Sequence, residues 1–366
     1  MSASSDEEEL ARNVETQLGD LDLSSLDKIV QGLGDSEKET FGSSFVGIVK
    51  KFLNSEDASL YSNFLPYSIN VIFGDVLEYI PYFALIIVFC ISFSLIGGMS
   101  SDKNKSLKNL IHIIFFSAIA VIVLKIILSL MNSTSNVIYS LQSQMEVVFP
   151  VLLTITTAIG GNVTASTFQP MLAVLTTGIA FVFRNILLPI FVFSVIFGVV
   201  GNVSKNVKLD KFSKFFSSLF GWIVGIIFTI FVSFLTISGL TASSADSISF
   251  RTAKFAIKSY VPLLGSYLAD GINVILASSV LVKNAVGVSA LMLLIASVFA
   301  SIIKIIVVIL LLKLTSAILE PLCDKEVPDF LFSLSKSLNM LIVTLVAISV
   351  MYLISLSILM CLTNII

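Results

Sequence analysis

The chain has 366 residues, of which 56% are hydrophobic and only 13% are charged, and its mean hydropathy is +1.00. A typical soluble domain has about 25% charged residues, so this composition excludes a soluble enzyme and indicates an all-α, polytopic integral membrane protein. The formal charge of −2 is unevenly distributed, because residues 1–78 contain fifteen acidic and five basic side chains, whereas the remainder contains nine acidic and seventeen basic ones.

The first 78 residues form the acidic part of the chain. Residues 1–20 have few apolar side chains, which predicts a disordered N-terminus. Residues 21–78 are expected to be an amphipathic, helical, extracytoplasmic segment. Apolar residues recur there at helical spacing in two short runs: Leu23, Leu26, Ile29, Val30 and Leu33, then Phe45, Ile48, Val49, Phe52 and Leu53. This pattern fits either an element that docks on a membrane surface or partner, or a small helical cap on the membrane body.

Residues 79–146 are predicted to contain the first two transmembrane helices, at about 79–98 and 110–131. The loop between these helices carries Lys103, Lys105 and Lys108 against one aspartate. Basic residues gather in cytoplasmic loops, so the loop is expected in the cytoplasm and the N-terminus outside.

Residues 147–241 are predicted to form the first of two repeats. Pro150, Gly160, Gly161 and Pro170 interrupt an apolar stretch, which favours a broken or re-entrant helix. Two apolar runs follow at about 171–200 and 217–241, with a lysine-rich loop between them.

Residues 242–366 are predicted to form a basic amphipathic linker and the second repeat. Pro262 and the sequence Gly271-Ile272-Asn273-Val274 echo Pro150 and Gly160-Gly161-Asn162-Val163. Apolar runs then follow at about 286–312 and 338–362, as they do in the first copy. The resulting prediction is about six transmembrane helices plus two broken or re-entrant segments in an internal duplication. A topology with eight crossings is the rival, and the pattern does not say whether the repeat is parallel or inverted.

Broken segments at matching positions point to a site within the membrane. The candidate residues are Pro150, Asn162, Arg184, Asn185, Pro262, Asp270 and Asn273. Arg184 is costly near the middle of an apolar run, so it has either a functional role, with Asp270 as its nearest candidate partner, or only a stem that reaches the membrane interface. Lys304 is instead expected to extend its flexible stem to the membrane interface.

A second group of candidates is basic or polar. Arg251, Lys254 and Lys258 share one helical face, which fits contact with lipid headgroups, an acidic protein surface or only solvent. Lys283 and Asn284 are further candidates for lipid or partner contact.

Residues suited to catalysis are scarce. The chain has one histidine, His112, three widely spaced cysteines and no phosphate-binding loop of the GxxxxGK[ST] type. Neither an enzyme activity nor a metal, a cofactor or a nucleic-acid partner is therefore expected.

Two segments carry a resemblance to a known family. The run FRTAKFAIKSYVPLLGSYLADGINVILASSVLVKNAVGV, from Phe250 to Val288, and the run KLTSAILEPL, from Lys313 to Leu322, resemble stage III sporulation protein AE of endospore-forming bacteria. Members of that family commonly begin with a signal peptide, which the polar start of this sequence does not resemble.

The resemblance implies a place in a complex between the mother cell and the forespore. Its implied partners are the other proteins of the same operon, including an ATPase homologue and ring-forming proteins, and the forespore protein Q. The chain would lie in the mother-cell membrane that faces the forespore, in contact with lipid and with other copies of itself if it forms a homo-oligomer. Two functions remain open: the membrane core of this secretion-like channel complex, or a stand-alone permease for a small solute.

Overall fold

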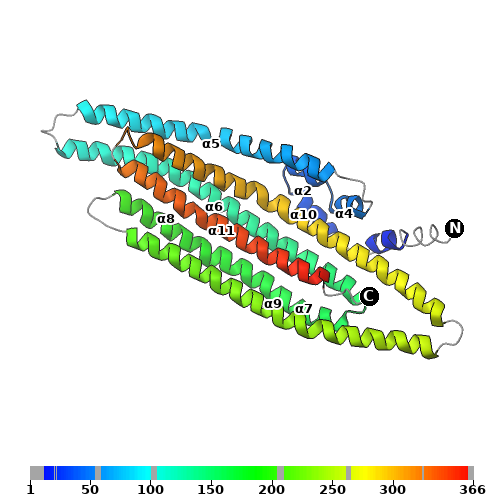
Figure 1. The fold of residues 1–366 in the computed structure, drawn as a ribbon. Coiled ribbons are helices and arrows are strands. Elements are labelled where there is room, and N and C mark those ends of the chain that lie inside the picture. Colours follow the sequence, from blue (N-terminus) through cyan, green and yellow to red (C-terminus); the bar gives the residue numbers. More distant parts are fainter. Residues whose placement is uncertain are drawn as a thin grey trace.

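The computed structural model describes residues 12–19, 21, 23–53, 59–99, 105–203, 210–260, 265–323 and 325–361. All regular elements among these residues are helices (Figure 1). After a helix at residues 12–19, they are α2 (Ser24–Gln31), α3 (Asp35–Phe41), α4 (Phe45–Leu53), α5 (Ser59–Met99), α6 (Lys105–Ala158), α7 (Asn162–Val182), the π-helix η1 (Phe183–Leu187), α8 (Leu188–Val203), α9 (Asp210–Tyr260), α10 (Gly265–Leu319) and α11 (Glu326–Cys361).

Six helical stretches are long and apolar enough to cross a membrane, which confirms the predicted polytopic all-α class. Each of the six predicted transmembrane segments overlaps one of them. They are Pro66–Ser94, Ile113–Ala158, Asn162–Gly201, Lys211–Ile237, Val274–Leu319 and Glu326–Cys361.

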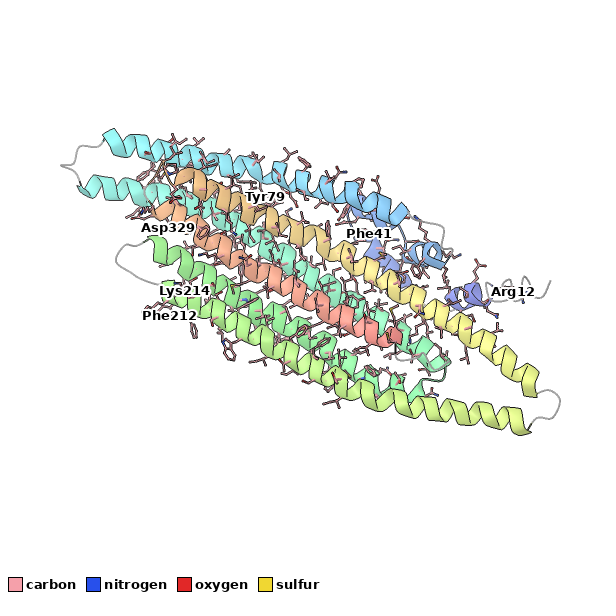
Figure 2. All side chains as sticks on the ribbon, in the orientation of Figure 1. Arg12, Phe41, Tyr79, Phe212, Lys214 and Asp329 are labelled. Atoms are coloured by element: carbon pink, nitrogen blue, oxygen red, sulfur yellow. The ribbon has the colours of Figure 1, made fainter. Side chains whose placement is uncertain are left out.

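The long helices lie side by side in an elongated bundle (Figure 1). At about 1.5 Å per residue, the 54 residues of α6 extend for about 80 Å, well beyond the roughly 30 Å of bilayer hydrocarbon. The ends of α5, α8 and α10 and the starts of α6, α9 and α11 all lie at one end of the bundle, which we call the basic end because Lys211, Lys214 and Lys325 lie there (Figure 1). Figure 2 shows Lys214 and Asp329 at this end and Arg12 at the other.

The first predicted break is a turn between two long helices. Helix α6 continues through Pro150 to Ala158, and α7 contains Pro170, so the prediction that these prolines interrupt the helix is wrong. The chain reverses at Gly160, whose φ of 96° is a conformation that glycine adopts without a steric penalty. Pro150 has no backbone N–H to donate, but proline is tolerated in a transmembrane helix when neighbouring helices support the backbone. Pro262, in the second predicted break, lies outside the described residues.

The N-terminal helices form a cap on the bundle, as the second of the two sequence interpretations proposed. Leu26, Val30, Phe45 and Val49 are completely buried and belong to the same apolar core as the long helices. The Asp27 carboxylate accepts a hydrogen bond from the Phe45 amide at 2.6 Å, which joins α2 to the start of α4.

The predicted disorder of residues 1–20 is wrong for residues 12–19, which are helical. Val14 and Leu18, four residues apart, are buried in the core. This apolar pair holds the short helix against the bundle together with the Glu15–Lys50 ion pair and the hydrogen bond from Gln17 to Ser278, both at 3.4 Å.

The domain boundaries predicted at 78/79, 146/147 and 241/242 lie inside α5, α6 and α9, so they do not separate structural elements. In both predicted copies, one helix runs towards the basic end and the next one runs back (Figure 1). This arrangement is what a parallel duplication would produce, and the duplication itself stays a prediction.

Candidate functional site

A group of charged side chains joins α5 to α10. Lys304 Nζ lies 3.1 Å from a Glu78 carboxylate oxygen and 3.7 Å from an Asp75 carboxylate oxygen. It also lies 5.5 Å from the centre of the Tyr79 ring. The expectation that Lys304 only extends to the membrane interface is therefore wrong: its side chain is 28% exposed and its charge is neutralised within the chain.

An open cavity of about 540 Å³ lies beside this ion pair, between α3 of the cap and α5, α6 and α10. The Tyr67 hydroxyl donates to the Glu37 carboxylate at 3.5 Å, and the Tyr67 ring packs against Phe41 and Phe299. The cap thus closes one side of the cavity. The lining residues are Gly34, Asp35, Glu37, Tyr67, Asn70, Val71, Gly74, Asp75, Glu78, Ser133, Ala300, Ser301 and Lys304.

Helical spacing explains why these carboxylates converge. Asp75 and Glu78 are three residues apart, which places both on the side of α5 that faces α10. Glu37 accepts a hydrogen bond from the Gly34 amide and thereby stabilises the start of α3. Asp35 and Glu37 also line the cavity, so its lining contains four acidic side chains and one basic side chain, Lys304. No group of three or more His, Cys, Asp or Glu in the described part of the chain could hold a metal ion.

Lys283 is placed differently from the sequence prediction. It was expected on a surface that contacts lipid or a partner, but its side chain is completely buried where α10 packs against α11. One turn further along, Gly287 lies so close to Met360 that an added Cβ would be within 2.5 Å of the sulfur. The tight contact leaves Lys283 no access to lipid, and Asn284 beside it is half-buried.

Arg184 and Asn185 lie in the π-helical turn η1 and are both exposed. The Arg184 guanidinium carbon lies 5.5 Å from the centre of the Tyr139 ring on α6. Asn185 donates to the Phe181 carbonyl in its own helix at 3.1 Å. Such π turns interrupt α-helices rarely and are frequent at functional sites.

The predicted pairing of Arg184 with Asp270 is wrong. Arg184 lies beside Tyr139 on α6. Five residues further along α6, Gln144 donates a hydrogen bond to Ser297 on α10 at 2.8 Å, so Ser297 marks the part of α10 that lies nearest in height to Arg184. Asp270 lies 27 residues before Ser297 on the same helix, which corresponds to about 40 Å along its axis. No side chain bridges that distance.

The remaining candidates are dispersed. Pro150 and Asn162 are exposed on either side of the α6–α7 turn. The structure gives helical backbone but no side-chain placement for four others, Arg251, Lys254 and Lys258 on α9 and Asn273 on α10.

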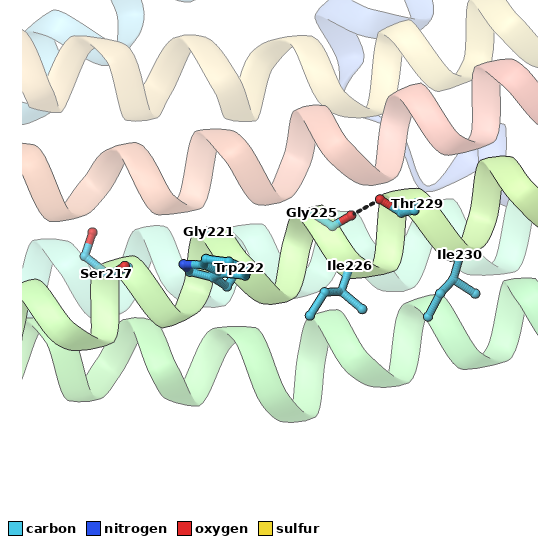
Figure 3. Close-up of a pocket in the computed structure, with 8 residues that line it drawn as sticks. Ser217, Gly221, Trp222, Gly225, Ile226, Thr229 and Ile230 are labelled. Atoms are coloured by element: carbon cyan, nitrogen blue, oxygen red, sulfur yellow. Dashed lines mark hydrogen bonds between the residues drawn. The ribbon is translucent and has the colours of Figure 1, made fainter.

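The outer surface of α9 carries a hollow of about 720 Å³ that the sequence analysis did not predict (Figure 3). Small residues recur along it every four positions, at Ser217, Gly221, Gly225 and Thr229, and Trp222 beside them is 72% exposed. The Thr229 hydroxyl donates to the Gly225 carbonyl at 2.8 Å, as Figure 3 shows. This spacing allows a neighbouring transmembrane helix to approach closely. The hollow could have been predicted from the same four-residue spacing of small residues in the segment 217–241.

The fold and these polar positions define a class, a polytopic α-helical membrane protein with charged side chains within its spans. A family model for stage III sporulation protein AE matches residues 43–363, so the chain belongs to that family and the resemblance noted from the sequence is confirmed. The chain is similar to stage III sporulation protein AE of Bacillus subtilis (strain 168), with 24% identity over 315 residues, which cover 85% of this chain and 78% of that protein. No solved structure matches it.

Proposed function

We propose that this sporulation protein is the membrane core of a channel or secretion-like complex between the mother cell and the forespore. The observation that carries the proposal is the family match over residues 43–363, which includes all six candidate spans. The proposed partners are the other proteins of the stage III sporulation A operon, including the ATPase homologue and the ring-forming proteins, and indirectly the forespore protein Q.

The proposed orientation places the basic end in the cytoplasm of the mother cell. Lys211 and Lys214 are exposed where α9 begins, and Lys325 precedes the start of α11. Basic residues are enriched in cytoplasmic loops, which supports this direction. In this proposed orientation, the acidic cap lies on the side of the membrane that faces the forespore.

The proposed docking region for extracytoplasmic partners is the far end of α9 and α10. The two helices extend there beyond the rest of the bundle (Figure 1). Arg251, Lys254 and Lys258 follow one another on α9 at intervals of three and four residues, so they share a helical face. A basic face on a projecting helix suits an acidic surface of a ring-forming protein.

Co-isolation tests this proposal. The full-length tagged protein is solubilised from sporulating cells, and its partners are identified by mass spectrometry. We expect the operon proteins to be recovered with the unaltered protein, and the ring-forming proteins to be lost with Arg251→Glu/Lys254→Glu/Lys258→Glu. Recovery of the tagged protein alone, together with solute flux by the pure protein in liposomes, would instead support the stand-alone permease.

A further inference from the structure

We infer that a stripe of polar side chains along α6 lines a water-filled passage through the membrane. The inference rests on the proposed channel function and adds to it the surface that meets water. This polar stripe consists of Asn132, Asn136, Tyr139, Ser143 and Glu146, which follow one another at intervals of three or four residues and therefore share one face of the helix. Ser143 is half-buried, and the other four side chains are exposed.

The polar stripe gives this part of α6 the opposite pattern to that of a lipid-facing helix. On the side of α6 that is turned towards the bundle, Ile138, Leu141 and Met145 are buried in the apolar core. On α5, in contrast, the outward side chains are apolar, and Leu77 and Val88 are 68% and 60% exposed. Lipid accepts a surface such as that of α5, whereas a polar surface at membrane depth normally faces protein or water.

Arg184 and Asn185 widen the polar stripe near its middle. Both are exposed in η1, and the Arg184 guanidinium carbon lies 5.5 Å from the centre of the Tyr139 ring. From residue 126 to residue 204, Arg184 and Glu146 are the only charged residues of the sequence. The two charges of this long apolar region therefore both lie on or beside the polar stripe.

The polar stripe lies at about half the depth of the apolar spans. Asn136 is at the middle of the candidate span Ile113–Ala158. Gln144, which lies on the buried side of the same part of α6, donates to Ser297 at 2.8 Å, and Ser297 is at the middle of the span Val274–Leu319. Two neighbouring helices thus give the same depth.

The packing of α8 against α9 gives the same depth for Arg184. Phe193 on α8 stacks on Phe216 on α9 with ring centres 5.5 Å apart, and these helices run in opposite directions (Figure 1). Arg184 is nine residues before Phe193, and Gly225 is nine residues after Phe216. Gly225 is next to the middle of the apolar span Lys211–Ile237, so Arg184 lies at about half the depth of that span.

Lipid headgroups are out of reach for Arg184 at this depth. An arginine side chain extends for only about 7 Å, whereas either end of the α9 span is roughly 20 Å away along the helix axis. Charged side chains within a membrane normally face protein or water. The Arg184 charge is therefore stabilised by something other than the lipid interface.

A second copy of the chain packed against the polar stripe would not pair its charges. Glu146 follows Tyr139 by seven residues, so it lies about 10 Å further along α6 than the contact with Arg184. A rotation axis along the membrane normal keeps each residue at its own depth, so this offset remains between copies. Only Ser143 in the stripe is of the small kind that lets helices approach closely. Water, in contrast, solvates both charges where they are.

Cysteine labelling tests whether the polar stripe meets water. In the full-length protein, with its three native cysteines replaced by alanine, a single cysteine is placed at Asn136, at Tyr139 or, as the control, at Leu77. Leu77 is 68% exposed on α5, near the middle of the span Pro66–Ser94. Opened membranes of sporulating cells are treated with a charged methanethiosulfonate reagent that does not cross lipid. Thiolates form readily only in water, so we expect Asn136→Cys and Tyr139→Cys to react at least about tenfold faster than Leu77→Cys.

Two further measurements separate a failure of this inference from a failure of the proposed complex. Co-isolation of the operon proteins from the same membranes reports whether the complex has formed, and labelling after denaturation verifies that every variant carries a reactive thiol. If both stripe cysteines react as slowly as Leu77→Cys in an assembled complex, the stripe faces lipid or a packed partner, and the inference is overturned while the complex stands. Fast labelling without co-isolation would overturn the proposed complex but not the water-lined stripe.

Charge reversal tests whether Arg184 faces the passage. Tyr139→Cys is labelled with an anionic and with a cationic methanethiosulfonate reagent, and the ratio of the two rate constants is compared between variants. Arg184→Glu should shift this ratio about tenfold towards the cationic reagent, because the local potential changes sign. Lys125→Glu, fourteen residues away on α6 and therefore beyond about 10 Å of screening length, is the matched control and should leave the ratio unchanged. An unchanged ratio in Arg184→Glu would overturn the assignment of this arginine to the passage.

Discussion

Two regions of the bundle differ in whether their intramembrane charges are paired within the chain. At the junction of α5 and α10, Lys304 is neutralised within the chain by Asp75 and Glu78. The α6–α7 face is the exposed surface formed by Tyr139 and Glu146 on α6 and by Arg184 and Asn185 in η1. On this face, neither Arg184 nor Glu146 has an ion-pair partner among the described residues. The difference indicates that the first group holds the fold together, whereas the second is available for contacts outside the chain.

The largest effect is expected from removing an aromatic residue that anchors the cap to the bundle. Phe45 is completely buried, so Phe45→Ala should cost about 3–5 kcal/mol of cap attachment through lost burial and a cavity. Limited proteolysis should then cleave the first 53 residues much faster than in the unaltered protein. Phe52→Ala is the matched control on the same helix, because Phe52 is 44% exposed and its loss should change the rate little. Equal protection of both variants would show that the cap does not depend on this core.

Removing the central cation should be the next largest perturbation. Lys304→Met leaves two carboxylates without a counter-charge and should lower the free energy of unfolding by about 2–3 kcal/mol. The value is below that of a fully buried pair because the Glu78 side chain is 54% exposed. Thermal unfolding in detergent measures the loss, with Lys125→Met, an exposed lysine on α6, as the control.

A compensating variant separates charge from packing at the same junction. Adding Asp75→Asn and Glu78→Gln to Lys304→Met removes all three charges, and most of the lost stability should return. A triple variant as unstable as Lys304→Met alone would mean that the lysine stem, and not the ion pair, joins the helices.

One buried hydrogen bond between α6 and α10 should contribute less to the free energy of unfolding than the Lys304 ion pairs do. Gln144 is completely buried and donates to Ser297 at 2.8 Å, so Ser297→Ala should cost about 1 kcal/mol. Ser349→Ala is a suitable comparison, because the Ser349 hydroxyl bonds a carbonyl of its own helix and joins no neighbour. Unfolding curves that coincide for the two variants would argue against a contribution from the Gln144–Ser297 bond.

Local patterns predicted the membrane part of the fold well. Six apolar runs gave six spans, because hydropathy over about twenty residues is a local property. The same patterns wrongly predicted that Pro150 breaks the helix. A proline that ends a helix in water is tolerated in a membrane when neighbouring helices support the backbone. They also missed the helix at residues 12–19, whose stability comes from burial against distant parts of the chain.

The candidate site depended more on long-range contacts and was predicted less well. Lys304 and Glu78 are separated by 226 residues, so no local spacing could pair them. Lys283 looks like a surface residue in the sequence, and only the packing of α10 against α11 shows that it is buried. Arg184 was singled out correctly as an unusual charge in an apolar run, but the partner assigned to it, Asp270, lies too far along α10.

The smallest effect on folding is expected from Arg184, the counterpart of Lys304 on the α6–α7 face. Arg184→Gln removes only an exposed contact with the Tyr139 ring, so the stability of the dilute, monomeric protein in detergent should change by about 0.5 kcal/mol. Lys304→Gln, the same change of charge at the other site, should cost several times more. A loss for Arg184→Gln as large as that for Lys304→Gln would mean that Arg184 is neutralised within its own chain, and the two regions would then hold their charges in the same way.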